Sequence, residues 1–318
     1  MDLRDLQTFV TVAAQGTVSK AALHLHVAQP ALSRRISALE RELGVRLFDR
    51  IRRRLVLTGE GERLLSECQG IVAAVDALTE RAELLRRPDS GVLKVALTPQ
   101  MIDGVFSNFL HHYAEKFPNV EIRLTEAVGM EPFARLDAGD VHLVISYQQL
   151  VEVESHWLET FPLPPIEFLA AGHESLVFKP GRTAEVAQLA RHPLLLLDKS
   201  FAGMRGMFDA VCRLAAVKPR VYIESRSPHT LLSMAEAGHG IAIVPSVLPT
   251  HRYRLRIARV AYRGRPLRGL LAVFWDRRRV LPPYANEFCK VLDGYMRRVF
   301  PISRPTVPRL HRKAASIE

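Results

Sequence analysis

The 318-residue chain has the composition of a folded globular protein, with 48% hydrophobic and 24% charged residues and a net charge of +11. Its three cysteines, Cys68, Cys212 and Cys289, stand too far apart to indicate a disulfide framework or a zinc site. The start MDLRDLQTFV lacks the apolar run of a signal peptide, and no stretch reaches the roughly 20 apolar residues of a membrane span. We therefore expect two or three domains, no membrane partner and a cytoplasmic location.

The positive charge is concentrated at the two ends of the chain. Residues 1–87 carry 14 Lys and Arg against 11 Asp and Glu, residues 88–250 carry 13 against 18, and residues 251–318 carry 17 against 4. Residues 27–57 alone carry 8 basic against 3 acidic residues. A basic segment of this kind suits the phosphates of nucleic acid, although the same charges could equally form a solvated face.

Three amphipathic helices are predicted at the N-terminus. Apolar residues repeat at helical spacing over residues 3–13 and again over 18–25, after a break at Gly16. The third helix begins near Pro30, which is favoured in a first turn because it lacks an N–H group. One face of this helix is apolar, with Leu32, Ile36, Leu39 and Leu43, and the opposite face carries Pro30, Ser33, Arg34 and Ser37.

A polar face with arginine, held by two preceding helices, is typical of the helix-turn-helix proteins that enter the DNA major groove. Arg34 could pair with guanine, and Gln29 with Ser33 could contact adenine or phosphate. The next segment, RLFDRIRRRLVLT, indicates two short strands around a basic turn, as in the wing of a winged helix. The predicted DNA-binding residues are Gln29, Pro30, Ser33, Arg34, Ser37, Arg50, Arg52, Arg53 and Arg54.

The segment FVTVAAQGTVSKAALHLHVAQPALSRRISALERELGVRLFDR, followed by LVLTGEG, resembles the N-terminal domain of LysR-type transcriptional regulators. The resemblance extends over about residues 1–87. It departs from many members at Ile51 and Arg52 in the wing, and Thr58 is followed by Gly-Glu rather than Glu-Ala. The resemblance implies a winged helix-turn-helix domain at residues 1–58 that binds double-stranded operator DNA. It also implies a homodimer, a tetramer built from it, and contact with RNA polymerase.

A long helix is predicted from Thr58 to Arg87. Thr58 can serve as its N-cap, and Glu60 and Glu62 fall in the first turn, where negative charge suits the helix dipole. Apolar residues then alternate at spacings of four and three, which is the heptad pattern of a coiled coil. We therefore predict that residues 59–87 pair two copies of the chain through Leu64, Cys68, Ile71, Val75, Leu78, Ala82 and Leu85.

Apolar strands alternate with helices after Leu93, beginning with LKVALT, VEIRLTEA and VHLVIS. Further strands are predicted at IEFLAA, HPLLLL, RVYIE, GIAIVP and LLAVFW. Strand–helix alternation favours parallel α/β sheets, and about 200 residues are enough for two lobes. The fold class predicted for the whole chain is therefore α+β and multidomain.

The family resemblance continues more loosely in this half, through FPNVEIRLTEA, LDAGDVHLVIS, AAGHESL and AEAGHGIAIVPS. It implies a two-lobed effector-binding domain like the periplasmic binding proteins, with strands that cross between the lobes. The implied boundaries are 91–300 for the domain, about 91–161 and 267–300 for lobe 1, about 162–266 for lobe 2, and crossovers near 161–165 and 263–267.

Ligands of such α/β lobes bind beyond the carboxyl ends of strands, where helix N-termini favour anions. Four segments fit this position: TPQM, SY, DKSFAGMRG and SRSPH. Each hydroxyl among them could instead be a plain helix cap. Together they suggest a small carboxylate effector, with an aromatic carboxylate as one option. The predicted effector-binding residues are Thr98, Gln100, Ser146, Ser200, Phe201, Arg205 and Ser227.

The sequence does not predict an enzyme, a metal site or a bound cofactor. No nucleophile, acid–base pair or metal-ligand cluster stands at a recognisable spacing, and the paired histidines point apart on their helices. The main alternative is a solute-binding-like protein without a DNA role, because the second domain alone resembles one. Residues 301–318, rich in proline and basic residues, are predicted to be a disordered tail that either adds DNA affinity or is simply solvated.

Overall fold

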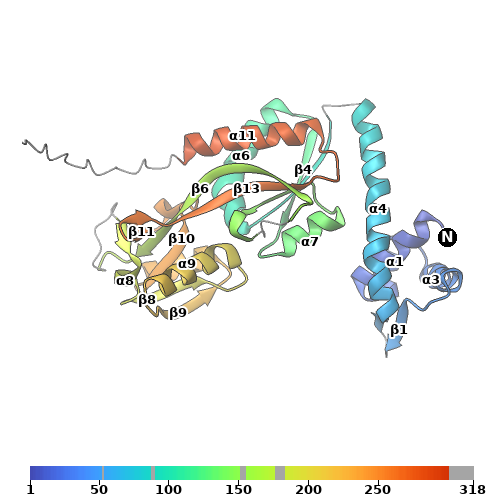
Figure 1. Cartoon of the computed structure of the whole chain (residues 1–318), viewed down its shortest axis with the longest axis horizontal. Helices are drawn as coiled ribbons and strands as arrows, with labels where there is room; N and C mark the ends of the chain where they lie inside the picture. The colour runs from blue at the N-terminus through green and yellow to red at the C-terminus, as the bar shows by residue number, and fades with distance from the viewer. Residues whose placement is uncertain (52–53, 87–89, 151–154, 176–182, 301–318) are drawn as a thin grey trace, which may run out of the picture.

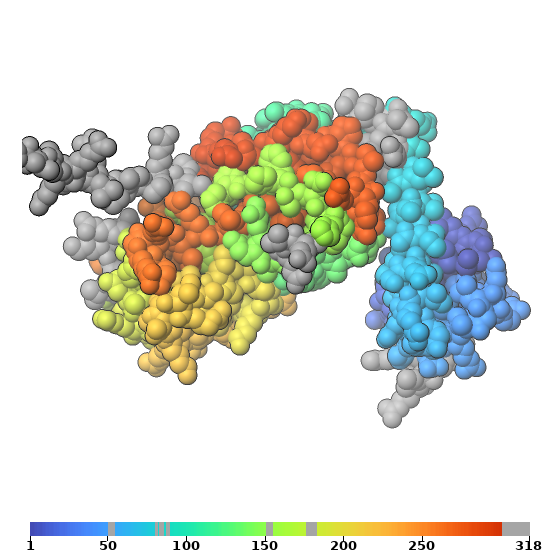
Figure 2. Space-filling view, viewed as in Figure 1, coloured from blue at the N-terminus to red at the C-terminus, as the bar shows by residue number. Residues whose placement is uncertain are grey.

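The computed structural model describes residues 1–51, 54–86, 90–150, 155–175 and 183–300. Figure 1 shows a small N-terminal domain in blue, a long upright helix, and a larger α/β body. The space-filling view shows the N-terminal domain and the long helix standing beside that body (Figure 2). The α+β multidomain fold class is confirmed, whereas the predicted tail at 301–318 lies outside the described residues.

Three helices and a hairpin form the N-terminal domain. They pack around Phe9 and Leu32, whose side chains are buried. The first helix begins with a capping box of Asp2 and Asp5 and ends at Gly16, which has a φ of 66°. The hairpin pairs Phe48 with Leu57 and is antiparallel, as a wing requires. The elements are α1 (Leu3–Gln15), α2 (Val18–His24), α3 (Gln29–Leu43), β1 (Phe48–Ile51) and β2 (Arg54–Leu57).

The junction between α3, the wing and the next helix is fixed by an acid and a glycine. The Glu40 carboxylate accepts hydrogen bonds from the backbone N–H groups of Leu47 at 2.8 Å and Phe48 at 3.2 Å. Gly61 lies so close to the hairpin that a Cβ atom there would be 2.2 Å from the carbonyl oxygen of Leu47. Both contacts fix the wing against the helices on either side of it.

Helix α4 (Gly59–Arg86) is the long helix that the sequence predicts. The Thr58 hydroxyl accepts a hydrogen bond from the N–H of Gly61 at 2.9 Å and donates one to the carbonyl of Arg46 at 2.6 Å. Thr58 thus caps α4 and ties it to the wing. Neither α4 nor any other helix in the described part of the chain is long and apolar enough to cross a membrane.

Lobe 1 is a sheet in the order β4-β3-β5-β13-β6, covered by helices on both faces. β3 runs parallel to β4 and β5, whereas β13 is antiparallel to β5 and β6. Phe109 and Phe288 pack edge to face beneath one face, and Phe133 packs on the other. The elements are β3 (Gly91–Leu97), α5 (Pro99–Met101), the π-helical turn η1 (Ile102–Phe106), α6 (Ser107–Lys116), β4 (Val120–Glu126), α7 (Glu131–Ala138), β5 (Leu143–Tyr147), η2 (Gln148–Leu150), β13 (Arg268–Asp276) and α11 (Pro283–Val299).

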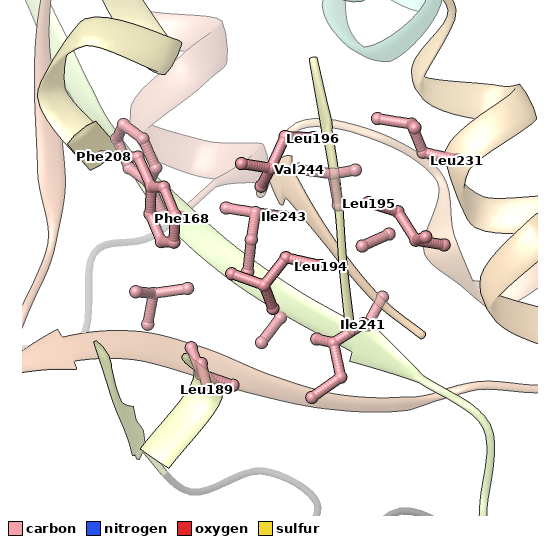
Figure 3. Packing of buried hydrophobic residues seen from close by; sticks show 14 of the residues in the cluster. Phe168, Leu189, Leu194, Leu195, Leu196, Phe208, Leu231, Ile241, Ile243 and Val244 are labelled. Carbon is pink, nitrogen blue, oxygen red and sulfur yellow. The ribbon is translucent and has the colours of Figure 1, made fainter. Parts of the chain in front are cut away.

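Lobe 2 continues the sheet in the order β6-β10-β8-β9. Figure 3 shows its core, in which Phe168 and Phe208 lie together and Ile243 stands near Leu194. Two of its strands, β7 and β11, were not predicted, whereas β12 falls within the crossover segment expected at 263–267. The elements are β7 (Thr183–Glu185), α8 (Val186–Leu189), β8 (Pro193–Leu197), α9 (Ala202–Leu214), β9 (Arg220–Ser225), α10 (Pro228–Glu236), β10 (Ile241–Pro245), η3 (Thr250–Arg252), β11 (Arg256–Tyr262) and β12 (Arg265–Pro266).

The long strand β6 (Leu158–Gly172) belongs to both lobes. Its pairing with β13 ends at Glu167 opposite Arg268, and its pairing with β10 begins at Phe168 opposite Pro245. The predicted crossover segment 161–165 thus lies within β6, and the strand changes partners a few residues later, between Glu167 and Phe168. The return crossing falls between β12 and β13, within the predicted segment 263–267.

Candidate functional site

Helix α3 has one buried and one exposed face. Leu32, Ile36 and Leu39 are buried in the core that α3 shares with α1 and α2. The exposed face carries the predicted DNA-binding residues of this helix, namely Gln29, Pro30, Arg34 and Ser37, with Ser33 half-buried beside them. Because the buried face anchors the helix, the exposed face is held in a fixed orientation.

The arginine on this exposed face is unpaired. Arg34 forms no ion pair or hydrogen bond with any residue of the described part, whereas its neighbour Arg35 lies 3.6 Å from the carboxylate of Asp5. The Ser19 hydroxyl donates a hydrogen bond of 3.3 Å to the side-chain oxygen of Gln29, which ties that side chain to α2. An unpaired guanidinium on a fixed, exposed helix is the arrangement that can pair with guanine in the major groove.

The wing has the predicted antiparallel hairpin, with Ile51 opposite Arg54. Arg50 and Arg54 lie on its two strands. Arg52 and Arg53, both predicted to contact the DNA backbone, lie outside the described residues.

Helix α4 divides its predicted dimerisation residues between two environments. Leu64 and Cys68 pack against the core of the N-terminal domain, so their apolar surface is already used within the chain. Ile71 and Leu78 are 49% and 67% exposed, and Ala82 is exposed as well. Val75 is half-buried, and Leu85 lies on the last turns of the helix. Among the described side chains of α4, the exposed predicted dimerisation residues therefore begin at Ile71.

A cavity lies between the two lobes at the carboxyl ends of β3 and β5. Leu97 is paired with Ile145 across these parallel strands, so the residues that follow them, Thr98 and Ser146, are neighbours. Four of the predicted effector-binding residues line this cavity: Thr98, Gln100, Ser146 and Phe201. The sequence rule that places ligands beyond strand ends therefore brings these four together.

The other three predicted effector-binding residues have structural roles outside the cavity lining. Ser200 donates its hydroxyl and its N–H to the Asp198 carboxylate in a tight turn. Ser227 caps α10 by accepting a hydrogen bond from the N–H of Thr230. Both fit the alternative of a plain cap or turn.

Arg205 requires a correction, because it is buried and already paired. Its guanidinium donates to Glu224 at 2.6 Å, to the carbonyl of Leu197 at 2.8 Å, and to Asp209 at 3.0 Å. Burial alone would lower the pKa of Arg205, but its hydrogen bonds to Glu224 and Asp209 raise it. Arg205 therefore holds α9 against β8 and β9, and it leaves no cation for the expected carboxylate effector.

Residues from the two lobes also meet beside the cavity. The Nε2 atom of His229, on α10 of lobe 2, lies 3.1 Å from Oδ2 of Asp103 in lobe 1. The Nδ1 atom of the same ring lies 3.0 Å from the Tyr253 hydroxyl. Sequence reasoning missed this contact between lobes, because Asp103 and His229 are separated by 126 positions and neither stands in a recognisable motif.

Glycines bring the lobes into close contact. A Cβ atom on Gly203 of α9 would lie 2.6 Å from Cδ2 of Tyr147, and one on Gly269 would lie 2.3 Å from Cε1 of the same ring. Gly104, in the π-helical turn, approaches lobe 2 so closely that a Cβ atom would lie 2.3 Å from the carbonyl oxygen of Val247. The ring of Tyr147 therefore occupies space that only glycine leaves free.

A buried carboxylate marks the crossing between the lobes. Glu167 sits where β6 passes from one lobe to the other, and its two oxygens pair with Arg259 of β11 at 2.8 Å and Arg268 of β13 at 3.0 Å. One strand from each lobe, β11 and β13, is thereby joined to β6 by charge as well as by backbone pairing.

The three thiols are buried. Burial raises the pKa of Cys212 to about 11 and that of Cys289 to about 12, and burial also raises the pKa of Cys68. Among the residues that the structure describes, no three His, Cys, Asp or Glu side chains form a group that could hold a metal ion.

Comparisons with known proteins identify both halves of the chain. Residues 3–62 match the model of the bacterial regulatory helix-turn-helix protein, lysR family, and residues 86–297 match the LysR substrate binding domain. The regulator IlvR of Caulobacter vibrioides is 31% identical over 264 residues, which cover 78% of this chain and 83% of IlvR. OxyR, a DNA-binding transcriptional dual regulator of Escherichia coli K12, is 30% identical over 255 residues, which cover 80% and 82%.

Solved structures agree with the family models. Full-length CbnR, crystallised with its target DNA, is 25% identical and superposes with a TM-score of 0.68 over 93% of this chain and all of CbnR. The helix-turn-helix match leaves the alternative of a solute-binding-like protein without support. The chain belongs to the LysR family of transcriptional regulators and combines a DNA-binding domain with an effector-binding domain, without enzymatic activity.

Proposed function

We propose that α3 reads an operator sequence in the major groove and that Arg34 is its principal base-reading residue. The observation that carries this proposal is the contrast between two neighbouring arginines. Arg34 is exposed and unpaired among the described residues, while Arg35 pairs with Asp5 of α1. Ser33, Ser37, Gln29 and Pro30 surround Arg34, and the arginines of the wing at 50 and 52–54 contact phosphates.

Binding of purified protein to duplexes selected from a random pool tests this proposal. We expect Arg34→Ala to cost about 1–3 kcal/mol on the selected duplex and much less on random sequence. Arg35→Ala removes the same charge one position away and serves as the matched control, with a small loss on both duplexes. Equal loss on both duplexes for Arg34→Ala would show that Arg34 contacts only phosphate.

The second half of α4 pairs two copies of the chain through the apolar side chains that the N-terminal domain leaves exposed. Ile71 and Leu78 support this role, since such exposed apolar residues on one long helix are typical of a coiled-coil seam. A dimer places two α3 helices over two half-sites of an operator with two-fold symmetry. Assembly of dimers into tetramers, contact with RNA polymerase and a cytoplasmic location complete the proposal.

A small molecule in the cavity between the lobes supplies the regulatory signal. The cavity is lined from both lobes, by Thr98, Gln100 and Ser146 on one side and Phe201 on the other. A ligand can shift a conformational equilibrium only by preferring one arrangement, and contacts with both lobes provide such a preference. Met204→Phe places a larger side chain in the cavity and should abolish regulation of the target gene in cells. Unchanged regulation would contradict this role.

A further inference from the structure

The lining of the cavity is apolar, apart from four uncharged polar residues, Thr98, Gln100, Ser146 and Tyr147. Lobe 2 contributes Leu197, Phe201, Met204 and Val247, and lobe 1 adds aliphatic side chains and the ring of Tyr147 to Thr98, Gln100 and Ser146. No charged side chain lines it among the described residues. The nearby cation Arg205 is held by Glu224 and Asp209.

An anion would therefore be poorly stabilised in this cavity. A carboxylate would lose its hydration without gaining a cation as a partner. The first turn of α9, which includes the lining residues Gly203 and Met204, offers partial positive charge to an anion. That effect offsets only part of the cost of removing a full charge from water.

One polar atom of the lining has no partner. Oε1 of Gln100 is buried, with 4% of the residue exposed, and accepts no hydrogen bond from the described residues. A buried acceptor without a donor is unfavourable, so a bound molecule that brings an O–H or N–H group gains a hydrogen bond there. Gln100, Thr98 and Ser146 all come from lobe 1, whereas lobe 2 supplies apolar surface to the opposite wall.

We propose that the ligand of this cavity is a neutral, mainly apolar molecule whose O–H or N–H group donates a hydrogen bond to Oε1 of Gln100. This inference rests on the proposed role of the cavity as the effector site. The cavity is about 30 Å³, which is room for one or two water molecules, so a ligand of this class enters only when the lobes move apart. The ligand-bound arrangement then separates Gly104 from Val247 and weakens the contact between Asp103 and His229.

Calorimetric titration of the full-length protein with benzyl alcohol, toluene and benzoate tests the ligand class, because the three share a ring and differ in the donor and the charge. We expect benzyl alcohol to bind about five- to tenfold more tightly than toluene, and benzoate to bind most weakly. Gln100→Leu should remove the difference between benzyl alcohol and toluene, with Gln100→Met as a second variant if the first does not fold. Met204→Phe should weaken both, whereas the exposed control Met234→Phe should change neither.

Tightest binding by benzoate, abolished by Met204→Phe, would overturn the neutral class while leaving the cavity as the effector site. Equal affinity for benzyl alcohol and toluene would show that Gln100 is satisfied by water, and no binding of any probe would also overturn the proposal. Operator affinity measured with saturating benzyl alcohol separates the two levels of inference. If benzyl alcohol binds as expected but leaves operator affinity unchanged, the ligand class stands and the regulatory role of the cavity fails.

Discussion

The two functional regions of the molecule treat charge in opposite ways. On α3, Arg34 is exposed and unpaired among the described residues, on a helix whose other face is locked in a core. Around the cavity between the lobes, the cation Arg205 is buried against two carboxylates and the lining itself is uncharged. The face of α3 thus leaves a cation unneutralised in water, as binding to a polyanion requires, whereas the charges near the cavity are paired and lie outside its lining.

Helix α4 links the two regions, and disrupting its free surface should have the largest effect. Leu78→Glu places a charge on the exposed apolar half of the helix in both copies, so we expect dimers to disappear at micromolar concentration. Sedimentation velocity measures the outcome. Thr79→Glu adds the same charge at the next exposed position and should remain dimeric. A dimeric Leu78→Glu variant would place the pairing surface elsewhere.

The paired charges of the effector-binding domain should matter for stability. Asp276 is 2% exposed and binds Arg278 and Arg279, which also contact Asp137 and are partly exposed. Asp276→Ala removes several charge-assisted hydrogen bonds and should cost about 1.5–3 kcal/mol of unfolding free energy. Glu159→Ala, which breaks an exposed pair with Arg277 at 4.0 Å, should cost less than about 1 kcal/mol. Chemical denaturation of both variants measures the contrast, and similar losses would refute it.

The same buried acid predicts a dependence on pH. Burial alone would raise the pKa of Asp276, but its hydrogen bonds from Arg278 lower it. Because the folded pKa lies below the unfolded one, the stabilisation is complete above about pH 4 and is lost as pH falls through the lowered pKa. Unfolding measured between pH 6 and pH 3 should show a steeper loss in the wild type than in Asp276→Ala.

Burial should also make the cysteine thiols of the native protein slow to react. Burial raises the pKa of Cys212 from 9.0 to about 11, so its thiolate fraction near pH 8 should be about 100-fold lower than in the unfolded chain. We expect native protein to react with a thiol-specific disulfide reagent at least that much more slowly than denatured protein. A rapidly modified native Cys212 or Cys289 would contradict the burial and would point to redox sensitivity.

The smallest expected effect concerns the polar end of the cavity. Thr98→Val keeps the shape of the side chain and removes its hydroxyl, so folding and operator affinity should stay unchanged while ligand affinity falls by a few fold. Ser227→Ala should do the reverse, with a loss of about 1 kcal/mol in stability from α10 and no change in ligand affinity. Titration and thermal unfolding of both variants test this division. A large loss of ligand affinity in Ser227→Ala would show that Ser227 contacts the ligand.

Helix ends and amphipathic helices could be predicted from the sequence, because they depend on residues close together in the chain. Pro30, Gly16 and Thr58 mark helix ends, and apolar spacing of three and four predicted α3 and α4. The unpredicted strand β11, RIARVAY, carries Arg259 in its middle, and the partner of this arginine, Glu167, comes from β6. Its place in the sheet depends on β6, about 90 positions earlier, which no local pattern reveals.

Prediction of the candidate sites was limited in the same way, because contacts between residues distant in sequence cannot be seen in a local pattern. The rule about strand ends located Thr98, Gln100, Ser146 and Phe201 around one cavity. It failed for Arg205, because a basic residue near a strand end looks the same whether it faces a ligand or the carboxylates of Asp209 and Glu224. Partners distant in sequence decide between these two outcomes.

The ring of Tyr147 between Gly203 and Gly269 carries a consequence for how homologous sequences can vary. Since the ring fills the space of two Cβ atoms, neither glycine can gain a side chain while Tyr147 keeps its ring without a clash. We expect regulators with a side chain at the position of Gly203 or Gly269 to carry a smaller residue than tyrosine at the position of Tyr147. An alignment of relatives can therefore be divided at these three columns into subfamilies that share one lobe arrangement.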